Sequence, residues 1–382
     1  MTAILLYGST EHNAALRHEV PIEIGDEFAF AVDHGRTWIQ ASRLEAKRIA
    51  ACRPEATLID LHELGFKELA ESGISRAQLE LELAARAVAR TGIRSAIVDA
   101  GFPLALGDRL RADGLQLTVD EAVVTARRRR KTDAELAGIR RAQRAAEAAM
   151  TAARELFAGS EPVGDTLHLD GGPLTAERVR ARLRDAAWAH GAVLPNTAIV
   201  ASVWQGFGHE PGSGPLPARL PIQIDLWPCD ESSGCWADMT RTFVVGGEPP
   251  AEVLRQAGLV RRALDEARAS VRPGVTGREL HAQCCERFEA EGYRTQRTGP
   301  GDDPDEGFQF SLGHGVGLRV HEAPGLGRTG RDPFVPGDVL AIEPGLWQRD
   351  VGGVRFEDLL LVTDDGCELL TDFPYSLTPE GR

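Results

Sequence analysis

The sequence is short of cysteine, of aromatic residues and of positive charge. Its 382 residues include six cysteines, 6% aromatic residues, and 43 lysines and arginines against 57 aspartates and glutamates. The scattered cysteines lack the dense spacing of a disulfide scaffold, so we expect a cytoplasmic protein. A net charge of -14 argues against a nucleic-acid partner, because phosphate binding depends on lysine and arginine. No apolar run approaches the length of a membrane span, so no membrane partner is expected.

What the sequence does contain is enough chain for two domains. In the first part, β-like runs at 3–8, 27–33, 56–61, 95–101 and 115–120 alternate with helical stretches at 42–51 and 75–91, which predicts an α/β domain. The basic run at 127–131 marks the boundary, giving an N-terminal α/β domain at 1–128 and a second domain at 129–382. We interpret this run as a solvated helix entry rather than a nucleic-acid patch.

The second domain is predicted to be α+β. Thr132 and Glu135 form a capping box, so a long amphipathic helix should start there and stop near Gly159. The Gly-, Pro- and Asp-rich segment 159–173 is interpreted as a surface loop of unassigned role. Further helices are expected at 176–190, 251–271 and 278–291, and strands at 197–203, 221–227, 236–245, 339–343 and 353–363.

Two aspartates stand out in strand-like segments. In PIQIDLWP, Ile222, Ile224 and Leu226 share one face of a predicted strand, which leaves Asp225 on the other face. The turn-rich DESSG then leads into WADMTRTFVVG, so a hairpin could place Asp225 and Asp238 side by side. Taken alone, such residues are more often solvent-facing polar groups than ligands.

A glycine-rich segment, SLGHGVGLRVHEAP, carries two histidines. Glycines at 313, 315 and 317 would let the backbone approach a ligand closely. His314 and His321 are seven positions apart, so they do not share a strand face and should enter one site across a bend. A lone histidine here would more often be a packed core residue.

Two glutamates and an arginine lie in apolar runs. Glu343 ends the predicted strand of VLAIEPG, and Glu357 lies inside that of GGVRFEDLLLVTDDG. An ionised glutamate is expensive to bury unless it is paired or binds a metal ion. Two-residue alternation would point Arg355 and Glu357 the same way, so Arg355 is expected to face the same cavity.

Together these residues predict a centre with two metal ions. The carboxylates of Asp225, Asp238, Glu343 and Glu357 carry four negative charges beside the neutral imidazole of His314, and two divalent cations balance them. Oxygen-rich ligation with one nitrogen suits Mn²⁺, Co²⁺, Zn²⁺ or Fe²⁺, with Mn²⁺ the first expectation. No thiolate points to a structural zinc site.

In this order the motifs resemble those of the pita-bread metallopeptidases, which include methionine aminopeptidases, aminopeptidase P and prolidase. The resemblance covers roughly residues 130–375 through IDL, ADMTRTF, GHGVGLRVHEAP, IEPG and GVRFEDLLLVT. It implies a catalytic pita-bread (creatinase/aminopeptidase) domain after the extra N-terminal domain of the proline-directed branch. It also implies that Asp225 binds one metal ion, Asp238 and Glu357 bridge both, and His314 and Glu343 complete the second.

The sequence departs from that branch at specific positions. Asp225 and Asp238 are thirteen apart, farther than is usual, because the turn between them is longer. Trp347 replaces the usual tyrosine after the EPG motif. Gly325 stands where some prolidases have an arginine that grips the substrate carboxylate, and Arg328 or Arg331 could substitute for it.

The resemblance implies hydrolysis of short peptides at Xaa-Pro bonds by attack of a metal-bridging hydroxide, as an Xaa-Pro dipeptidase or aminopeptidase. Glu343 is then the expected general base. His321, together with His209 of the segment GFGHEPG, would hold the carbonyl oxygen and the scissile amide. Arg355 and Arg328 would orient carboxylates or brace the bridging aspartate.

Two other functions compete with this interpretation. One is a creatinase-like non-peptidase hydrolase, and the other is an inactive pita-bread module that only binds peptides. Both would be marked by loss of metal ligands, and all of the expected ligands are present. The resemblance also implies a homodimer.

Overall fold

The computed structural model describes residues 2–202, 210–304 and 306–380. The chain divides into two compact units, Met1–Arg128 and Arg129–Arg382. Among the described residues, no helix is both long enough and apolar enough to cross a membrane.

The first unit is built on a mixed sheet with the strand order β4-β3-β2-β1-β5-β6. On β1, Leu5 and Tyr7 pack into one core while Ile4 and Leu6 pack into another, so both faces of the sheet are covered. This explains the unbroken apolar run of β1 and agrees with the predicted α/β class. The strands are β1 (Ala3–Gly8), β2 (Phe28–Asp33), β3 (Arg36–Ala41), β4 (Thr57–Asp60), β5 (Ser95–Val98) and β6 (Gln116–Val119). The helices are α1 (Ala14–Glu19), α2 (Ala46–Cys52), α3 (Phe66–Glu71), α4 (Arg76–Thr91) and α5 (Leu104–Ala112).

Strand β3 was absent from the sequence prediction. It follows β2 through a two-residue turn at His34 and Gly35, whose φ angles are +46° and +77°. Two positive φ values are typical of a tight hairpin turn, so the DHGR sequence carried the signal. The strand begins with the polar residue Arg36, which lies opposite Asp33, so its start lacks the apolar alternation that predicts a strand.

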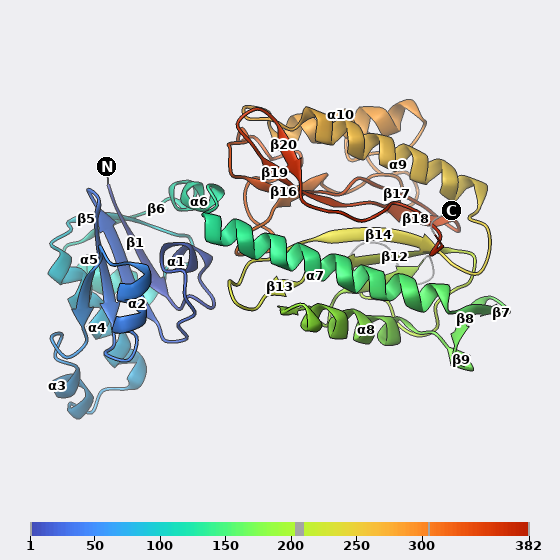
Figure 1. The fold of residues 1–382 in the computed structure, drawn as a ribbon. Coiled ribbons are helices and arrows are strands. Elements are labelled where there is room, and N and C mark those ends of the chain that lie inside the picture. Colours follow the sequence, from blue (N-terminus) through green and yellow to red (C-terminus); the bar gives the residue numbers. More distant parts are fainter. Residues whose placement is uncertain (1, 203–209, 305, 381–382) are drawn as a thin grey trace. The chain divides into compact units, whose positions relative to one another are not determined.

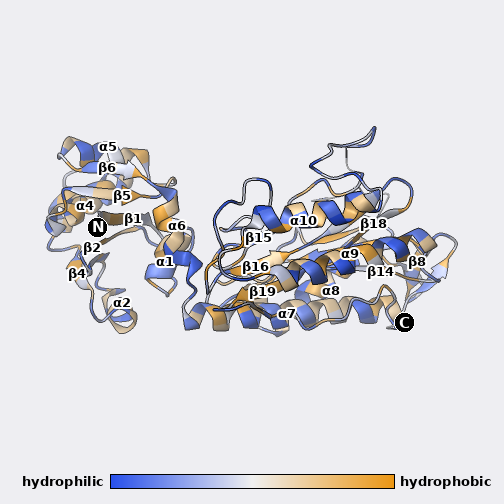
Figure 2. Cartoon of the chain, turned by 90° about the horizontal axis from the view of Figure 1, so that it is seen from above, coloured by the Kyte–Doolittle hydropathy of each residue, from blue (hydrophilic) through white to orange (hydrophobic). Residues whose placement is uncertain are grey.

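In the second unit, two pairs of helices cover the strands from opposite sides (Figure 1). The long helix α7 (Asp133–Ala158) is capped by Thr132 and Glu135 as predicted, and it packs beside α8 (Ala176–Ala189). On the other side lie α9 (Ala251–Ser270) and α10 (Gly277–Ala290). Hydrophilic and hydrophobic residues alternate along α7 and α9 in Figure 2, as expected of helices with one buried face.

The strands between these helices form two main sheets. In the first, β12 (Pro221–Leu226) lies between β11 (Ile199–Ser202) and β14 (Met239–Val244), and it shares a core with α7 and α8. The second has the order β15 (Gly313–Gly315), β16 (Val339–Ile342), β19 (Asp358–Val362) and β20 (Cys367–Leu369). It packs with α9, α10 and the hairpin of β17 (Gly345–Gln348) and β18 (Gly352–Arg355). The short strands β10 (Ala192–Val193) and β13 (Cys229–Asp230) pair with each other.

Two element predictions were wrong. The segment 159–173 is not only a loop, because β7 (Glu161–Val163), β8 (Thr166–Leu169) and β9 (Gly172–Pro173) form a small antiparallel sheet there. Buried Leu167 anchors this sheet in the main core, a long-range contact that turn-rich composition cannot reveal. The predicted strand 353–363 is two strands, β18 and β19, which belong to different sheets and break at Phe356 and Glu357.

The basic run after the first unit also differs from its interpretation as a solvated helix entry. Helix α6 (Glu121–Arg129) ends inside this run. The side chain of Arg129 is 12% exposed and pairs with Asp338, which is 1% exposed. Lys131 pairs with Glu322, and each of these side chains is only 3% exposed. Their acidic partners lie about two hundred positions away, so composition around the run could not predict the burial.

Candidate metal centre

Two aspartates enter the centre from neighbouring antiparallel strands. The apolar residues of β12 point into the core, as strand parity predicted, and Asp225 points away from it. The register places Asp225 opposite Thr240, so Asp238 lies just before β14 on the neighbouring strand. Both aspartates are buried, at 8% and 4% exposure. The predicted hairpin-like pairing of these segments is therefore present.

His314 and Glu343 come from the second sheet. His314 is the middle residue of β15 and lies opposite Ala341, and Glu343 directly follows β16. The backbone N–H of Glu343 donates to the carbonyl oxygen of Leu312 at 2.9 Å, which extends the strand pairing past the glutamate. The pairing therefore carries both side chains to the same edge.

The glycines around His314 lie against neighbouring backbone. A Cβ atom at Gly313 would clash with the carbonyl oxygen of Ala341, and one at Gly315 with the backbone of Ala323. These glycines let neighbouring backbone segments approach each other closely. The close approach brings the histidine segment onto the strand that ends in Glu343.

Glu357 occupies the break between β18 and β19. Thr240 Oγ1 donates to Glu357 Oε2 at 2.8 Å, and Glu357 N donates to Thr240 O at 3.1 Å. Arg241, which is 1% exposed, donates from Nη1 to Glu357 O at 2.7 Å and pairs with buried Asp358 at 3.0 Å. Sequence reasoning missed Thr240, Arg241 and Asp358. The available signal was the three consecutive polar residues, Thr240, Arg241 and Thr242, in the otherwise apolar run MTRTFVV.

These elements bring all five predicted ligands together. Three groups of side chains each place one ligand atom per residue within 4.8 Å of the others, and the groups overlap. They consist of Asp225, Asp238 and Glu357; of His314, Glu343 and Glu357; and of Asp238, His314 and His321. Asp238, His314 and Glu357 each belong to two of the three groups. Such overlap is the arrangement that two neighbouring metal ions require.

The pKa shifts show that ionisation of the clustered carboxyls is unfavourable when no cation is bound. Burial raises the pKa of Asp238, and repulsion from Glu357 and Asp225 adds to the rise. Burial and the neighbouring carboxylates likewise raise the pKa of Glu357, and burial raises that of Glu343 to about 7. Burial lowers the pKa of His314 to about 3, which leaves a neutral imidazole suited to metal binding. The donor set therefore fits two divalent ions, whose charge would favour the ionised carboxylates.

Arg355 is the cation of the cluster. It is 4% exposed, and its Nη2 donates to Asp225 Oδ2. Nη1 lies 3.6 Å from Glu343 Oε2, and Nε donates to Thr240 Oγ1 at 3.3 Å. Burial works against this charge, but the surrounding carboxylates outweigh it and raise the pKa of the guanidinium. Arg355 therefore faces the cluster, as predicted. The prediction assumed one continuous strand through Arg355 and Glu357, whereas the structure has two strands, β18 and β19.

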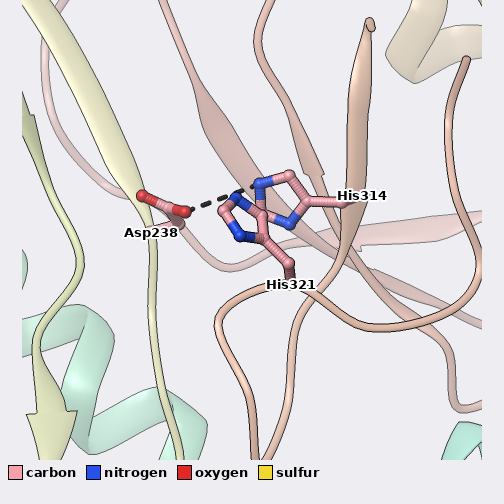
Figure 3. Close-up of side chains that lie close together, drawn as sticks. All are labelled: Asp238, His314 and His321. Carbon is pink, nitrogen blue, oxygen red and sulfur yellow. Dashed lines mark ion pairs between the residues drawn. The ribbon is translucent and has the colours of Figure 1, made fainter. Parts of the chain in front are cut away.

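The two histidines meet as expected, from different backbone segments (Figure 3). Their ring centroids are 4.2 Å apart, and the planes are inclined by 77°. His314 Nε2 lies 3.6 Å from Asp238 Oδ2 and 3.8 Å from Glu343 Oε1. His321 is exposed, so its ring can meet a ligand from solvent.

The remaining predicted residues lie farther out. Arg328 is exposed, and its Nη1 is 3.4 Å from the carbonyl oxygen of Gln296. Arg331 and Gly325 are also exposed, and a Cβ atom at Gly325 would meet no atom within 4 Å. His209 lies outside the described residues.

Comparisons with known proteins agree with this site. The model of metallopeptidase family M24 matches residues 137–364. A stretch of 136 residues is 38% identical to an Xaa-Pro dipeptidase of Pyrococcus furiosus and covers 35% of each chain. Another of 144 residues is 35% identical to the uncharacterized peptidase YqhT of Bacillus subtilis and covers 38% of this chain and 37% of that protein. These matches span little more than a third of the relatives' length.

Solved structures match over nearly the whole chain. The prolidase from Pyrococcus horikoshii has a TM-score of 0.73 at 22% identity and covers 99% of this chain and 95% of its own. The X-Pro aminopeptidase from Thermotoga maritima has a TM-score of 0.73 at 20% identity, with the same coverage. At this identity the likeness shows the fold alone, which is the pita-bread fold preceded by an α/β unit. Because the family model matches more than half of the chain, this protein belongs to metallopeptidase family M24.

Proposed function

We propose that this protein is a two-metal exopeptidase that hydrolyses short peptides at Xaa-Pro bonds, as a dipeptidase or an aminopeptidase. The observation that carries the proposal is the meeting of five ligand side chains in overlapping groups. The printed names of the relatives supply the substrate class, since they include Xaa-Pro dipeptidases and an X-Pro aminopeptidase. A creatinase-like hydrolase or an inactive binding module is disfavoured because the complete ligand set is present.

The proposed metal assignment is the one that the family resemblance implies, and the overlapping groups are compatible with it. Asp225 is proposed to bind one ion, Asp238 and Glu357 to bridge both, and His314 and Glu343 to complete the second. Two bound divalent ions would supply Lewis acidity and lower the pKa of a water molecule. We propose Mn²⁺ as the resident ion, since the set is rich in oxygen ligands.

The chain's own side chains have separate roles around that centre. Glu343 is proposed to accept a proton from the attacking water as general base. His321 is exposed beside His314, so it can donate a hydrogen bond to the substrate carbonyl or the scissile amide. Arg355 holds Asp225 in place through their ion pair. For Arg328 we propose contact with a substrate carboxylate, and for His209 a contact with the scissile amide that rests on resemblance alone.

Metal analysis combined with a peptide panel tests this function. The protein is stripped with a chelator, reloaded with Mn²⁺, Co²⁺ or Zn²⁺, and given Xaa-Pro dipeptides, Xaa-Pro-Xaa tripeptides and Met-Xaa peptides. We expect about two ions per chain and release of the residue before proline only from loaded protein. Asp238→Asn is the matched control and should lose both metal and activity. Failure of the fully loaded protein to hydrolyse any of these peptides would contradict the proposal.

The resemblance also supports a homodimer, which sedimentation would measure. A cytoplasmic location is proposed from the sparse, scattered cysteines.

A further inference from the structure

A buried ion pair lies beside the candidate metal centre without being part of it. Lys131 Nζ contacts Glu322 Oε1, and the two side chains are each 3% exposed. Lys131 directly precedes the cap of α7, and Glu322 directly follows His321. Removing two charges from water is unfavourable, and such a pair is weak support for stability alone. Its location next to a site residue therefore calls for a functional explanation.

Gly317 makes room for this pair. A Cβ atom at this position would clash with Glu322 Oε1 and would lie 2.8 Å from Lys131 Nζ. The pair thus packs directly over the backbone that follows His314. Three segments meet at one point, and glycine is the residue that leaves space for them.

The backbone of Glu322 is tied to the strand of His314. Gly315 N donates to Glu322 O at 3.0 Å, and Glu322 N donates to Gly315 O at 2.9 Å. His314 precedes Gly315 and His321 precedes Glu322, so this bridge sets the separation of the two histidines. Holding the Glu322 side chain therefore restrains the segment that carries the His321 ring.

We propose that Lys131 and Glu322 are positioning residues that hold His321 against His314 at the substrate side of the metal centre. The catalytic part of the inference rests on the proposed function, in which His321 contacts the substrate. Hydrogen-bonded ion pairs are directional, whereas apolar contacts are not. Displacement of a substrate-contacting group by about 1 Å can cost ~100-fold in rate. Loss of the pair is therefore expected to affect His321 before it affects the metal ligands.

Kinetic variants separate this role from a purely structural one. Lys131→Met and Glu322→Gln should each lower kcat by ~10–100-fold while metal content stays at the parental level. The double variant Lys131→Met/Glu322→Leu should recover melting temperature, because an apolar pair replaces a buried ionic one, without recovering kcat. Arg129→Met removes another buried ion pair of the same basic run and should lower the melting temperature only. Recovery of kcat together with stability in the double variant would overturn the proposal.

A spectroscopic arm tests the positioning without any peptidase assay. In zinc-loaded protein labelled with ¹³C-histidine, the His321 ring signal is assigned with His321→Gln. Lys131→Met should shift or broaden that signal and leave the other histidine signals in place, whereas Arg129→Met should not change it. An unchanged His321 signal in Lys131→Met would refute the positioning role. A parent protein that hydrolyses no peptide would refute the proposed function, and the ring signal would still decide the positioning.

Discussion

Arg355 donates to Asp225 inside the cluster of carboxylates, and the two side chains are 5% and 11% exposed. The arginine ends β18, and the aspartate lies on β12, in a different sheet. The ion pair therefore ties the two sheets together at the centre. A second nitrogen of the same guanidinium, Nη1, lies 3.6 Å from Glu343 Oε2.

Arg355→Met tests whether this arginine is needed for metal binding or only orients the metal ligand Asp225. Removing a cation from an acidic cluster does not weaken cation binding by electrostatics. We therefore expect parental metal content but a kcat lower by ~100-fold, since Asp225 loses the group that orients it. Metal content by mass spectrometry and kcat are measured on the same samples. Arg349→Met serves as the control, because it removes an arginine that also pairs with an aspartate, Asp303, but is itself 67% exposed. A parental kcat in Arg355→Met at parental metal content would contradict the orienting role.

Asp238→Asn should have opposite effects on the metal-free and metal-loaded proteins. Burial and neighbouring carboxylates raise the pKa of Asp238, so its charge is unfavourable when no cation is bound. Neutralising it should stabilise the chelator-treated protein and raise its melting temperature. The loaded parent should instead be more stable than the variant, because only the parent gains binding energy. Calorimetry with and without Mn²⁺ measures the difference in melting temperature between variant and parent in each state. Equal differences of the same sign in the two states would contradict the metal-site interpretation.

Local patterns predicted the elements that carry the site. Alternation of Ile222, Ile224 and Leu226 gave the direction of Asp225, and the capping box at Thr132 gave the start of α7. These predictions succeeded because parity and helix capping depend on residues close together in the sequence.

Predictions failed where a distant partner decides the structure. Glu357 interrupts its strand where Thr240, on another sheet, exchanges hydrogen bonds with it. Lys131 is buried because it forms an ion pair with buried Glu322. The segment 159–173 forms strands because Leu167 packs into the main core. In each case the determining contact joins segments far apart in the chain. Composition and periodicity describe only the neighbourhood of a residue, so they could not reveal these contacts.

Gly325→Arg should alter the preferred length of the substrate. A Cβ atom there meets nothing within 4 Å, so an arginine fits without displacing the backbone. The family resemblance implies that an arginine at this position would bind the substrate carboxylate, as in some prolidases. The variant should raise kcat/KM for an Xaa-Pro dipeptide relative to a tripeptide by ~10-fold, since a charged hydrogen bond contributes about 1.5–3 kcal/mol. Gly325→Gln adds bulk without charge and is the control. An equal effect of both substitutions would argue against carboxylate recognition.

Asp230 should confer stability that disappears in acid. Burial alone would raise the pKa of this carboxyl, but the ion pair with Arg141 and hydrogen bonds from Ser233 and Ser232 lower it to about 2, from the ordinary 3.8. A lowered folded-state pKa means that the contribution is present above pH ~4 and is lost as the pH falls toward ~2. Because Arg141 is 40% exposed, solvent screening limits the contribution to about 1 kcal/mol.

Asp230→Asn measures this contribution directly. Urea unfolding of the metal-free protein at several pH values should show the variant less stable than the parent at pH 7, with a difference that narrows below pH ~4. Asp165→Asn is the matched control, since Asp165 pairs with Arg219 at the surface and is 87% exposed. That substitution should change stability little at any pH. Asp230 lies in the segment between β12 and β14, near Asp225 and Asp238, and Arg141 lies on α7. A difference in stability between variant and parent that does not change with pH would mean that packing, rather than charge, holds this segment on α7.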